Sequence, residues 1–443
     1  MGRAPTIHFV GHASFIVEGE TGAVLADPWL TGTAFNDGWS PLSSPRLRDE
    51  LRERVTDVYI SHEHPDHFAP ASLQQLARAD APNIRIRKTR DGRVASYCRA
   101  KGFDVTEMPP HERVSFAPGF HAVCGPHRHM DSWLLIETGG TTLLNVNDCR
   151  INDAAQALRI RSVTGPVDVL FTQFSYANWV GNPDEVERRR AYADLMLSYV
   201  RTQIEIFEPR YVVPFASFVR FCHAENAYLT AELPRLRDVV EYIDTHTRAT
   251  PIALYPGETW IVGETHDNDA AIARYEADAA EPVAIRTPSR SLSMPELTAL
   301  SSEHVRRLRN RSNWMAATHA LEAAGFLRPV RIRLWDLDCT VEFRCNRGLR
   351  ETTEPPHIEM GTDSLAFCFE QDFGAETLYV NGRYRIVQGP EKLFFRHFYP
   401  AILNNQGYSF PLGAAQFVLS DRVSWRLRAL REALHIGKRT RKG

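Results

Sequence analysis

Short apolar runs separated by turns dominate the first 260 residues of the chain. β-branched and aromatic residues predict strands over 6–10, 14–18, 23–26, 55–60, 84–87, 132–137, 141–146, 166–174 and 211–215. Helical patterns lie between them, over 70–79, 92–101 and 184–208. Strands that alternate with helices in this way predict a layered α/β domain, which we assign to residues 1–264.

The pattern changes after Trp260. An acidic stretch is followed by several prolines and serines, so a linker is predicted over 265–295. The remaining segment, 296–443, is predicted to form a smaller α+β domain. Its predicted helices cover 294–309 and 315–324, and its predicted strands cover 331–335, 340–344, 364–370 and 378–386. A basic cluster at the end of the chain is typical of a solvated terminus and comprises Lys438, Arg439, Arg441 and Lys442.

Composition limits the class of protein. At ~150 residues per domain, the 443 residues predict two or three domains. Hydrophobic content of 43%, charged content of 24% and a net charge of −2 are ordinary for a globular protein, and no overall field favours nucleic acid. No stretch of ~18 apolar residues and no signal peptide is found, so we expect no membrane contact and a cytoplasmic location. Seven scattered cysteines do not predict a disulfide framework.

One loop concentrates the candidate chemistry. Directly after the predicted strand 55–60, the sequence SHEHPDHF places His62, His64, Asp66 and His67 within six residues. Imidazole and carboxylate groups this close are costly to bury without a cation, and they are the ligands that zinc and iron prefer. Pro65 prevents a regular helix, so the ligands should project from a loop. The motif predicts a site for two metal ions.

Three further ligands are predicted downstream. His127 (or His129) precedes one strand of a predicted hairpin, and Asp148 follows the other, so both can reach one cation. An ordinary Asn-Asp turn is the alternative for Asp148. His223 follows the last buried strand of the domain and completes the candidate set, although taken alone it would fit a surface histidine.

Other residues are expected to surround these ligands. Asp27 ends a strand, and His12 lies in the turn between the first two strands, so both are candidates for contact with the ligands themselves. A hydrogen-bonded histidine in a turn is the alternative for His12. The residues expected to line the site near the substrate are Trp29, Asp131 and Ser175.

The motifs together resemble those of the metallo-β-lactamase superfamily. Within it, DPWLTGTAFNDGW (27–39), YISHEHPDH (59–67), HRHMD (127–131), LLNVNDC (143–149) and PRYVVPFASF (209–218) resemble the branch of hydroxylases that act on CMP-N-acetylneuraminic acid. The resemblance implies a four-layered αββα sandwich with two metal ions, Asp148 bridging them. His62, His64 and His127 would hold one ion, and Asp66, His67 and His223 the other. The last segment resembles the C-terminal part of that hydroxylase and a sterol-carrier-like module.

Two enzymatic functions follow from this resemblance, and a binding protein with a degraded site is the remaining alternative. In the first, two irons support oxygenation of a small polar metabolite. Because the sequence lacks the paired Cys-x-His loops of a Rieske centre, electrons would come from a separate ferredoxin or Rieske-type protein. In the second, two zinc or manganese ions activate water to hydrolyse an ester, lactone or phosphodiester. Asp66 and Asp148 are the predicted catalytic carboxylates, iron is the favoured metal, and a homo-oligomer is compatible with the sequence.

Overall fold

The computed structural model describes residues 2–127, 130–311, 315–411 and 413, and its contacts divide the chain into two units. Unit 1 comprises residues 1–287 together with Tyr379–Gly382, and unit 2 comprises Pro288–Leu378 and the chain from Arg383 onward. The predicted ligand His129 and the basic cluster at 438–442 lie outside the described residues. No helix among the described residues is both long and apolar enough to cross a membrane.

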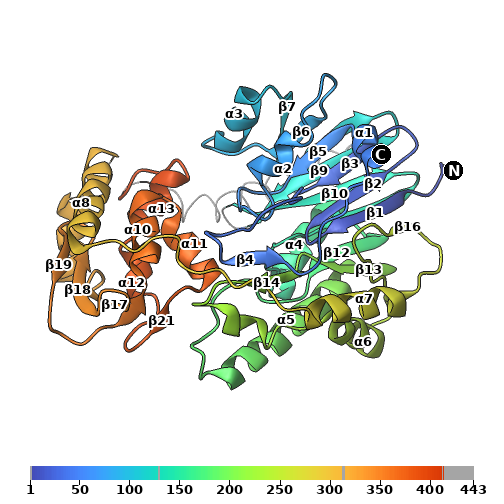
Figure 1. The fold of residues 1–443 in the computed structure, drawn as a ribbon. Helices are drawn as coiled ribbons and strands as arrows, with labels where there is room; N and C mark the ends of the chain where they lie inside the picture. Colours follow the sequence, from blue (N-terminus) through green and yellow to red (C-terminus); the bar gives the residue numbers. More distant parts are fainter. Residues whose placement is uncertain (1, 128–129, 312–314, 412, 414–443) are drawn as a thin grey trace. The chain divides into compact units, whose positions relative to one another are not determined.

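Two seven-stranded sheets form the centre of unit 1 (Figure 1). In spatial order, the first contains β16 (Thr259–Ile261), β1 (Thr6–Gly11), β2 (Ser14–Glu18), β3 (Ala23–Ala26), β5 (Asp57–Ile60), β6 (Asn83–Arg87) and β7 (Val105–Met108). The second contains β15 (Thr250–Pro251), β13 (Tyr211–Phe215), β12 (Val169–Gln173), β11 (Thr141–Asn145), β10 (Ser132–Thr138), β9 (Phe120–Pro126) and β8 (Arg113–Ala117). A separate two-stranded sheet pairs β14 (Val219–Phe221) with β4 (Trp39–Pro41).

The strand sequences explain why the sheets are covered on both faces. In β2, Phe15 and Val17 enter the core between the two sheets, whereas Ile16 enters the core beneath the outer helices. Successive side chains of a strand point to opposite faces, so a strand that is apolar throughout must be buried on both. Phe15 stacks on Phe171 of the second sheet, with ring centroids 4.2 Å apart. The two sheets therefore pack face to face.

Helices cover the outer faces of both sheets (Figure 1). The first sheet packs against α1 (Asp49–Arg54), α2 (Pro70–Gln74) and α3 (Arg93–Ala100). The second packs against α4 (Ala154–Thr164), α5 (Val186–Phe207) and α6 (Leu236–His246). A short 3₁₀ helix, η1 (Ala227–Thr230), follows β14. Unit 1 is thus the four-layered αββα sandwich that the sequence predicts.

The predicted linker 265–295 requires a correction, because α7 (Asn268–Ala280) lies within it. The Asp267 side chain caps this helix by accepting hydrogen bonds from two backbone amides, and Ala271, Ile272 and Tyr275 bury one face. The acidic composition that suggested a linker belongs to the exposed face of a helix. The boundary between the units falls at 287/288.

Unit 2 contains a five-stranded sheet and several helices. The sheet has the order β19 (Gly348–Glu351), β18 (Cys339–Arg344), β17 (Val330–Leu334), β20 (Ile358–Met360) and β21 (Arg385–Ile386). The helices are α8 (Met294–Arg311), α9 (Met315–Ala323), α10 (Thr362–Glu370), α11 (Gly374–Asn381), α12 (Leu393–Arg396) and α13 (Tyr399–Asn405). The end of α11, from Tyr379 onward, belongs to unit 1. Unit 2 is therefore an α+β unit, and its likeness to a sterol-carrier-like module stays a prediction.

Two predicted strands of unit 2 are wrong. Residues 364–370 lie in α10, and most of 378–386 is the end of α11 and a loop before the short β21. The aromatic-rich run 364–370 has a high strand propensity. However, Leu365 and Phe369 are buried one helical turn apart, and burial on nearly all sides stabilises the helix. Tertiary packing thus outweighs local propensity here.

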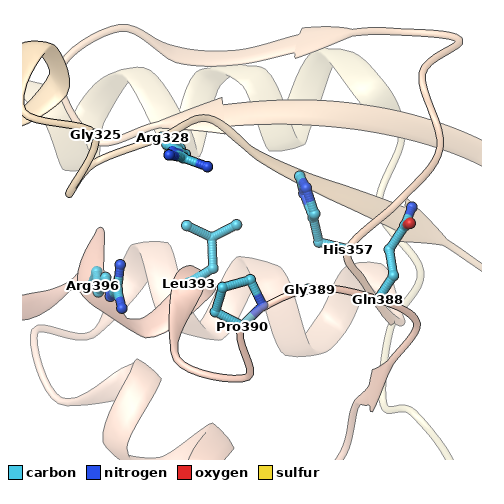
Figure 2. A pocket seen from close by; sticks show the side chains of 8 residues that line it. All are labelled: Gly325, Arg328, His357, Gln388, Gly389, Pro390, Leu393 and Arg396. Carbon is cyan, nitrogen blue, oxygen red and sulfur yellow. The ribbon is translucent and has the colours of Figure 1, made fainter.

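Unit 2 also carries an open pocket of about 360 Å³ (Figure 2). Arg328 and Arg396 line it together with His357, and Pro390 and Leu393 provide apolar contacts. All of the lining residues belong to unit 2.

Candidate metal centre

Two parallel strands place the candidate metal centre at one edge of the first sheet. β3 and β5 are neighbours, and the residues that follow them, Asp27 and Ser61, lie side by side. The backbone amide of Asp27 donates to the carbonyl of Tyr59 over 2.9 Å, and the amide of Ser61 donates to Oδ1 of Asp27 over 2.8 Å. The loop after β5 then turns tightly, because the amides of His67 and Phe68 both donate to the carbonyl of His64.

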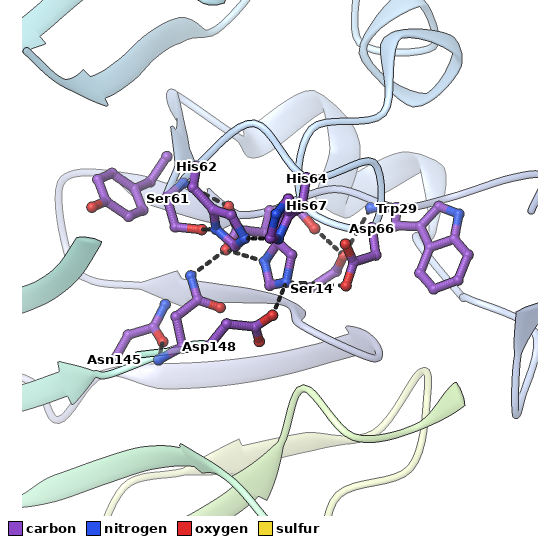
Figure 3. Close-up of polar contacts among 12 residues, drawn as sticks. Ser14, Trp29, Ser61, His62, His64, Asp66, His67, Asn145 and Asp148 are labelled. Carbon is purple, nitrogen blue, oxygen red and sulfur yellow. Dashed lines mark hydrogen bonds and ion pairs between the residues drawn. The ribbon is translucent and has the colours of Figure 1, made fainter. Parts of the chain in front are cut away.

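This turn brings the predicted ligands together (Figure 3). Two groups of three residues have ligand atoms that all lie within 4.8 Å of one another: His12, Asp66 and His67 in one, and His62, His67 and Asp148 in the other. His67 belongs to both groups. His64 joins the second group through His62, whose Nε2 lies 2.8 Å from Nδ1 of His64. The arrangement offers two adjacent positions for a cation.

Charge is concentrated on His67 and its carboxylate neighbours. Burial alone would lower the pKa of His67, but Asp66, Asp148 and Asp27 outweigh it and hold that pKa well above the ordinary value. Burial likewise opposes ionisation of Asp66, yet the positive charge of His67 and the hydrogen bond from His12 hold the pKa of Asp66 well below its usual range. Buried carboxylates therefore demand a positive partner, which a metal ion can supply in place of a proton.

The other two histidines are poised as neutral ligands. Burial, followed by the positive charge of His67 and His64, lowers the pKa of His62 well below its ordinary value. Burial also lowers the pKa of His64. A neutral imidazole keeps a lone pair, which is the form that binds metals.

Several ligand atoms lack hydrogen-bond partners among the described residues. They are Oδ1 of Asp66, Oδ1 of Asp148, Nδ1 of His12 and Nε2 of His67. Nε2 of His67 lies 3.2 Å from a carboxylate oxygen of Asp66 and equally far from one of Asp148, without hydrogen-bond geometry to either. Buried polar atoms are rarely left unpaired. Imidazole nitrogens and carboxylate oxygens in this state fit bound divalent cations.

Asp27 orients His67 from the opposite side. Oδ2 of Asp27 lies 3.1 Å from Nδ1 of His67 and accepts a hydrogen bond of 2.7 Å from the side-chain amide of Asn147. Since Nδ1 donates to Asp27, Nε2 is free to face Asp66 and Asp148. Sequence reasoning anticipated contact between Asp27 and the ligands but missed Asn147. The sequence clue to Asn147 was its place directly before Asp148. In the structure, Asn147 has a positive φ of 52°, a conformation that asparagine tolerates.

His12 contacts the candidate ligands directly. Its Nε2 lies 3.2 Å from Oδ2 of Asp66, and its backbone has a positive φ of 46°. The ring of Trp29 packs against it edge-to-face, with centroids 5.5 Å apart. The hydroxyl of Ser14, which sequence reasoning also missed, fixes this corner by accepting from the Trp29 amide and donating to the Asp27 carbonyl. His12 and Trp29 therefore close one side of the centre.

The remaining predicted residues lie close to strand ends. Both His127 and His223 are buried, and neither belongs to the two groups of three found among the described residues. The His127 amide donates to the Asp131 carbonyl, and Oδ1 of Asp131 lies 3.9 Å from Nε2 of His62. The His223 amide donates to Oδ1 of Asn226. Metal binding by His127 and His223 stays a prediction.

Ser175, a residue expected to line the site, is buried, and its backbone amide donates to the Ser217 hydroxyl over 3.1 Å.

A left-handed turn flanks His64. Phe35, Asn36 and Asp37 have φ values of 54°, 54° and 57°, a conformation that costs roughly 1–2 kcal/mol for a residue such as phenylalanine and less for asparagine and aspartate. The Phe35 ring packs edge-on against His64, with centroids 5.5 Å apart, and against Trp39 at 4.5 Å. Strained backbone of this kind gathers at functional sites.

The sandwich and the His/Asp cluster at its edge together form a domain with a candidate metal centre. Residues 6–207 match the family model described as "Beta-lactamase superfamily domain". The curated relatives include the cytidine monophosphate-N-acetylneuraminic acid hydroxylase of Danio rerio, which is 27% identical over 249 residues. That alignment covers 51% of this chain and 40% of the hydroxylase, so the chain spans less than half the length of this relative.

Another relative is a Mycolicibacterium smegmatis protein that is provisionally named as a Rieske 2Fe-2S iron–sulfur protein. It is 27% identical over 196 residues, which cover 38% of this chain and 34% of that protein. Among solved structures, CmlA, a diiron β-hydroxylase from Streptomyces venezuelae, gives a TM-score of 0.41 at 17% identity and covers 59% of this chain and 55% of its own. A metallo hydrolase from Ignicoccus hospitalis gives 0.41 at 18% identity, covering 58% and 97%.

Proposed function

We propose that this protein is a non-haem diiron oxygenase that hydroxylates a small polar metabolite. The observation that carries the proposal is the pair of ligand groups that share His67, with buried carboxylate oxygens that lack hydrogen-bond partners among the described residues. Two adjacent cation positions are what dinuclear chemistry requires.

The donor set favours iron. Each group combines histidine nitrogens with at least one carboxylate, and neither contains a thiolate. Imidazole and carboxylate ligands suit iron in oxygenases, although zinc and manganese also accept them. The sequence similarity to hydroxylases of a nucleotide-activated sugar acid supports the same choice. If bound, the two irons would provide the redox chemistry with which dioxygen reacts.

The residues of this chain have separate roles in this proposal. His62, His64, His67, Asp66 and Asp148 hold the ions, with His127 and His223 as further ligands. Asp27 sets the tautomer of His67 through its Nδ1, and His12 holds Asp66 in place. Trp29 is buried against His12 and keeps bulk water from that side of the centre.

An oxygenase needs electrons from a donor. We propose that a separate iron–sulfur protein of ferredoxin or Rieske type supplies them. A relative that is provisionally named as a Rieske protein supports this partner class. Neither nucleic acid nor membrane has a role in the proposal.

A dinuclear metallo-hydrolase is the second candidate. Oδ1 of Asp66 and Oδ1 of Asp148 are available to accept a proton from water, which is the task of a carboxylate in hydrolysis. In this case zinc or manganese would replace iron, and the substrate would be an ester, lactone or phosphodiester.

Isotope labelling separates the two functions. The iron-loaded protein is incubated with a metabolite extract and CMP-N-acetylneuraminic acid, with a ferredoxin–reductase pair, under ¹⁸O₂ or in H₂¹⁸O. We expect a product that carries ¹⁸O from dioxygen and forms only when both O₂ and the reductant are present. Undiminished anaerobic turnover, with label from water alone, would overturn the oxygenase and favour the hydrolase.

A further inference from the structure

A short segment from the C-terminal half of the chain belongs to unit 1. Residues Tyr379–Gly382 make their contacts there, although the chain before and after them belongs to unit 2. Asn381, the last residue of α11, is only 2% exposed. A buried amide far along the chain from the candidate metal centre needs a structural reason.

The contacts of Asn381 converge on the left-handed turn. Its side-chain amide donates to the carbonyl of Phe35 over 3.1 Å, and its own carbonyl accepts from the side chain of Asn226 over 2.6 Å. The same Asn226 side chain donates to the carbonyl of Gly38 over 3.0 Å. Both ends of the turn are thus tied to one another through Asn381 and Asn226.

The backbones approach each other closely at this point. A Cβ atom at Gly38 would lie 2.5 Å from Cβ of Asn381 and 2.9 Å from the carbonyl oxygen of Phe35. Gly382 has a φ of 67°, and a Cβ there would lie 2.6 Å from Leu229. The amide of Trp179 donates to the carbonyl of Tyr379 over 3.1 Å. Glycine on each side of the contact is what allows it to form.

We propose that Asn381 is a positioning residue for the candidate metal centre. It holds the carbonyl of Phe35, which keeps the turn left-handed and seats the Phe35 ring against His64. Three consecutive left-handed residues are unfavourable by themselves and persist only when the surroundings fix them. The C-terminal part of the chain thereby contributes to the orientation of His64. This inference rests on the metal binding proposed above and not on the choice between oxygenase and hydrolase.

The test is a titration of the metal-free, full-length protein with Co²⁺, followed by its visible absorption and by chelator competition. Asn381→Ala removes the amide donor, and Asn381→Asp keeps its shape but places an oxygen against the Phe35 carbonyl. We expect both variants to weaken one of two binding steps by ~10-fold or more and to change the Co²⁺ spectrum of that step. The other step should stay within ~3-fold, because in the described part of the chain no hydrogen bond, ion pair or ring contact joins His12, Asp66 or His67 to the turn.

Val380→Ala is the matched control. Val380 packs on the apolar cluster that contains Phe35 and Trp39, but it does not make the side-chain hydrogen bond to Phe35. It should lower thermal stability about as much as Asn381→Ala and leave both binding steps unchanged. Gly38→Ala places a Cβ atom against Asn381 and should reproduce the weakened binding step. Unchanged binding in both Asn381 variants, or an equal loss in Val380→Ala, would overturn the proposal. Absence of Co²⁺ binding by the wild-type protein would overturn the proposed metal centre itself.

Discussion

The chain buries histidines in two different environments. In unit 1, His67 lies between Asp66 and Asp148, with a nitrogen 3.2 Å from each carboxylate. In unit 2, His304 is fully buried among phenylalanine rings, with centroids 5.7 Å from Phe369 and 5.3 Å from Phe398. Both imidazoles are inaccessible to solvent, yet only the first has carboxylates beside it.

The pKa values follow from this difference. The carboxylates raise the pKa of His67 despite its burial. Burial, aided by Arg307, lowers the pKa of His304 from 6.5 to about 4. A buried histidine therefore indicates a cation site only when buried carboxylates accompany it. Without them, it is a neutral part of an aromatic core.

Removal of His67 should have the largest effect on metal binding. Because Nδ1 of His67 donates to Asp27 and its Nε2 faces both Asp66 and Asp148, His67→Ala should weaken the binding of at least one ion by more than ~100-fold. His304→Leu is the matched control and should retain full metal content. Elemental analysis of both purified variants provides the measurement, and two ions per chain in His67→Ala would contradict the ligand assignment.

The next-largest effect is expected in how the stability of unit 2 depends on pH. His304 and His397 each have a pKa of about 4 in the folded protein against 6.5 when unfolded, because burial disfavours the charged form. The unfolded state therefore binds the proton first as the pH falls. Stability is retained above pH 6.5, is lost progressively from 6.5 down to about 4, and changes by up to about 3 kcal/mol for each histidine.

Hydrogen exchange of peptides from α8 and α10, measured between pH 4 and 7.5, would report this loss. His304→Leu should reduce the slope between pH 4 and 6.5 by about half, since His397 remains. His319→Leu, at an exposed position of the same unit, should keep the wild-type slope. An identical slope in wild type and His304→Leu would refute this explanation.

Asp27→Asn tests whether the carboxylate behind His67 matters for the metal. Loss of the charge that accepts from Nδ1 should weaken metal binding by ~10–100-fold while the fold persists. Asp57→Asn is the control, since Asp57 is equally buried at the far end of β5 and pairs with Arg85 over 2.6 Å. It should lower stability without affecting the metal. The opposite pattern would make Asp27 purely structural.

Ser14→Ala should have the smallest effect. It removes the hydroxyl that links the Asp27 carbonyl to the Trp29 amide, which typically contributes ~1 kcal/mol, or about fivefold in metal affinity at most. Chelator competition measures the change. A loss as large as that of Asp27→Asn would show that the backbone of Asp27, and not its carboxylate, sets the position of His67.

The sequence carries enough information to predict a layered α/β domain and the loop that brings most of the candidate ligands together. The continuous apolar run of β2 and the ligand spacing of 62–67 are local signals, and each is interpreted without knowledge of the rest of the chain. The strand propensity of 364–370 is also local, but burial on all sides of α10 reverses it. Local pattern therefore succeeds where the tertiary environment agrees with it.

The remaining features depend on residues that are distant in sequence. The left-handed turn at Phe35 is held by Asn381, and Asn147 reaches Asp27 from the second sheet. No spacing rule links such pairs, because the contact exists only after the layers have assembled. In the loop 31–39, Phe35 is likewise buried against His64, which comes from a distant part of the sequence.

The metal content of the wild-type protein tests the central claim most directly. The claim is that the carboxylate–histidine cluster of unit 1 binds two metal ions. Native mass spectrometry of protein purified without oxygen, before and after reconstitution with Fe²⁺, should show two ions per chain, and His67→Ala should hold fewer than two. A wild-type chain that binds no ion or only one after reconstitution would contradict the account.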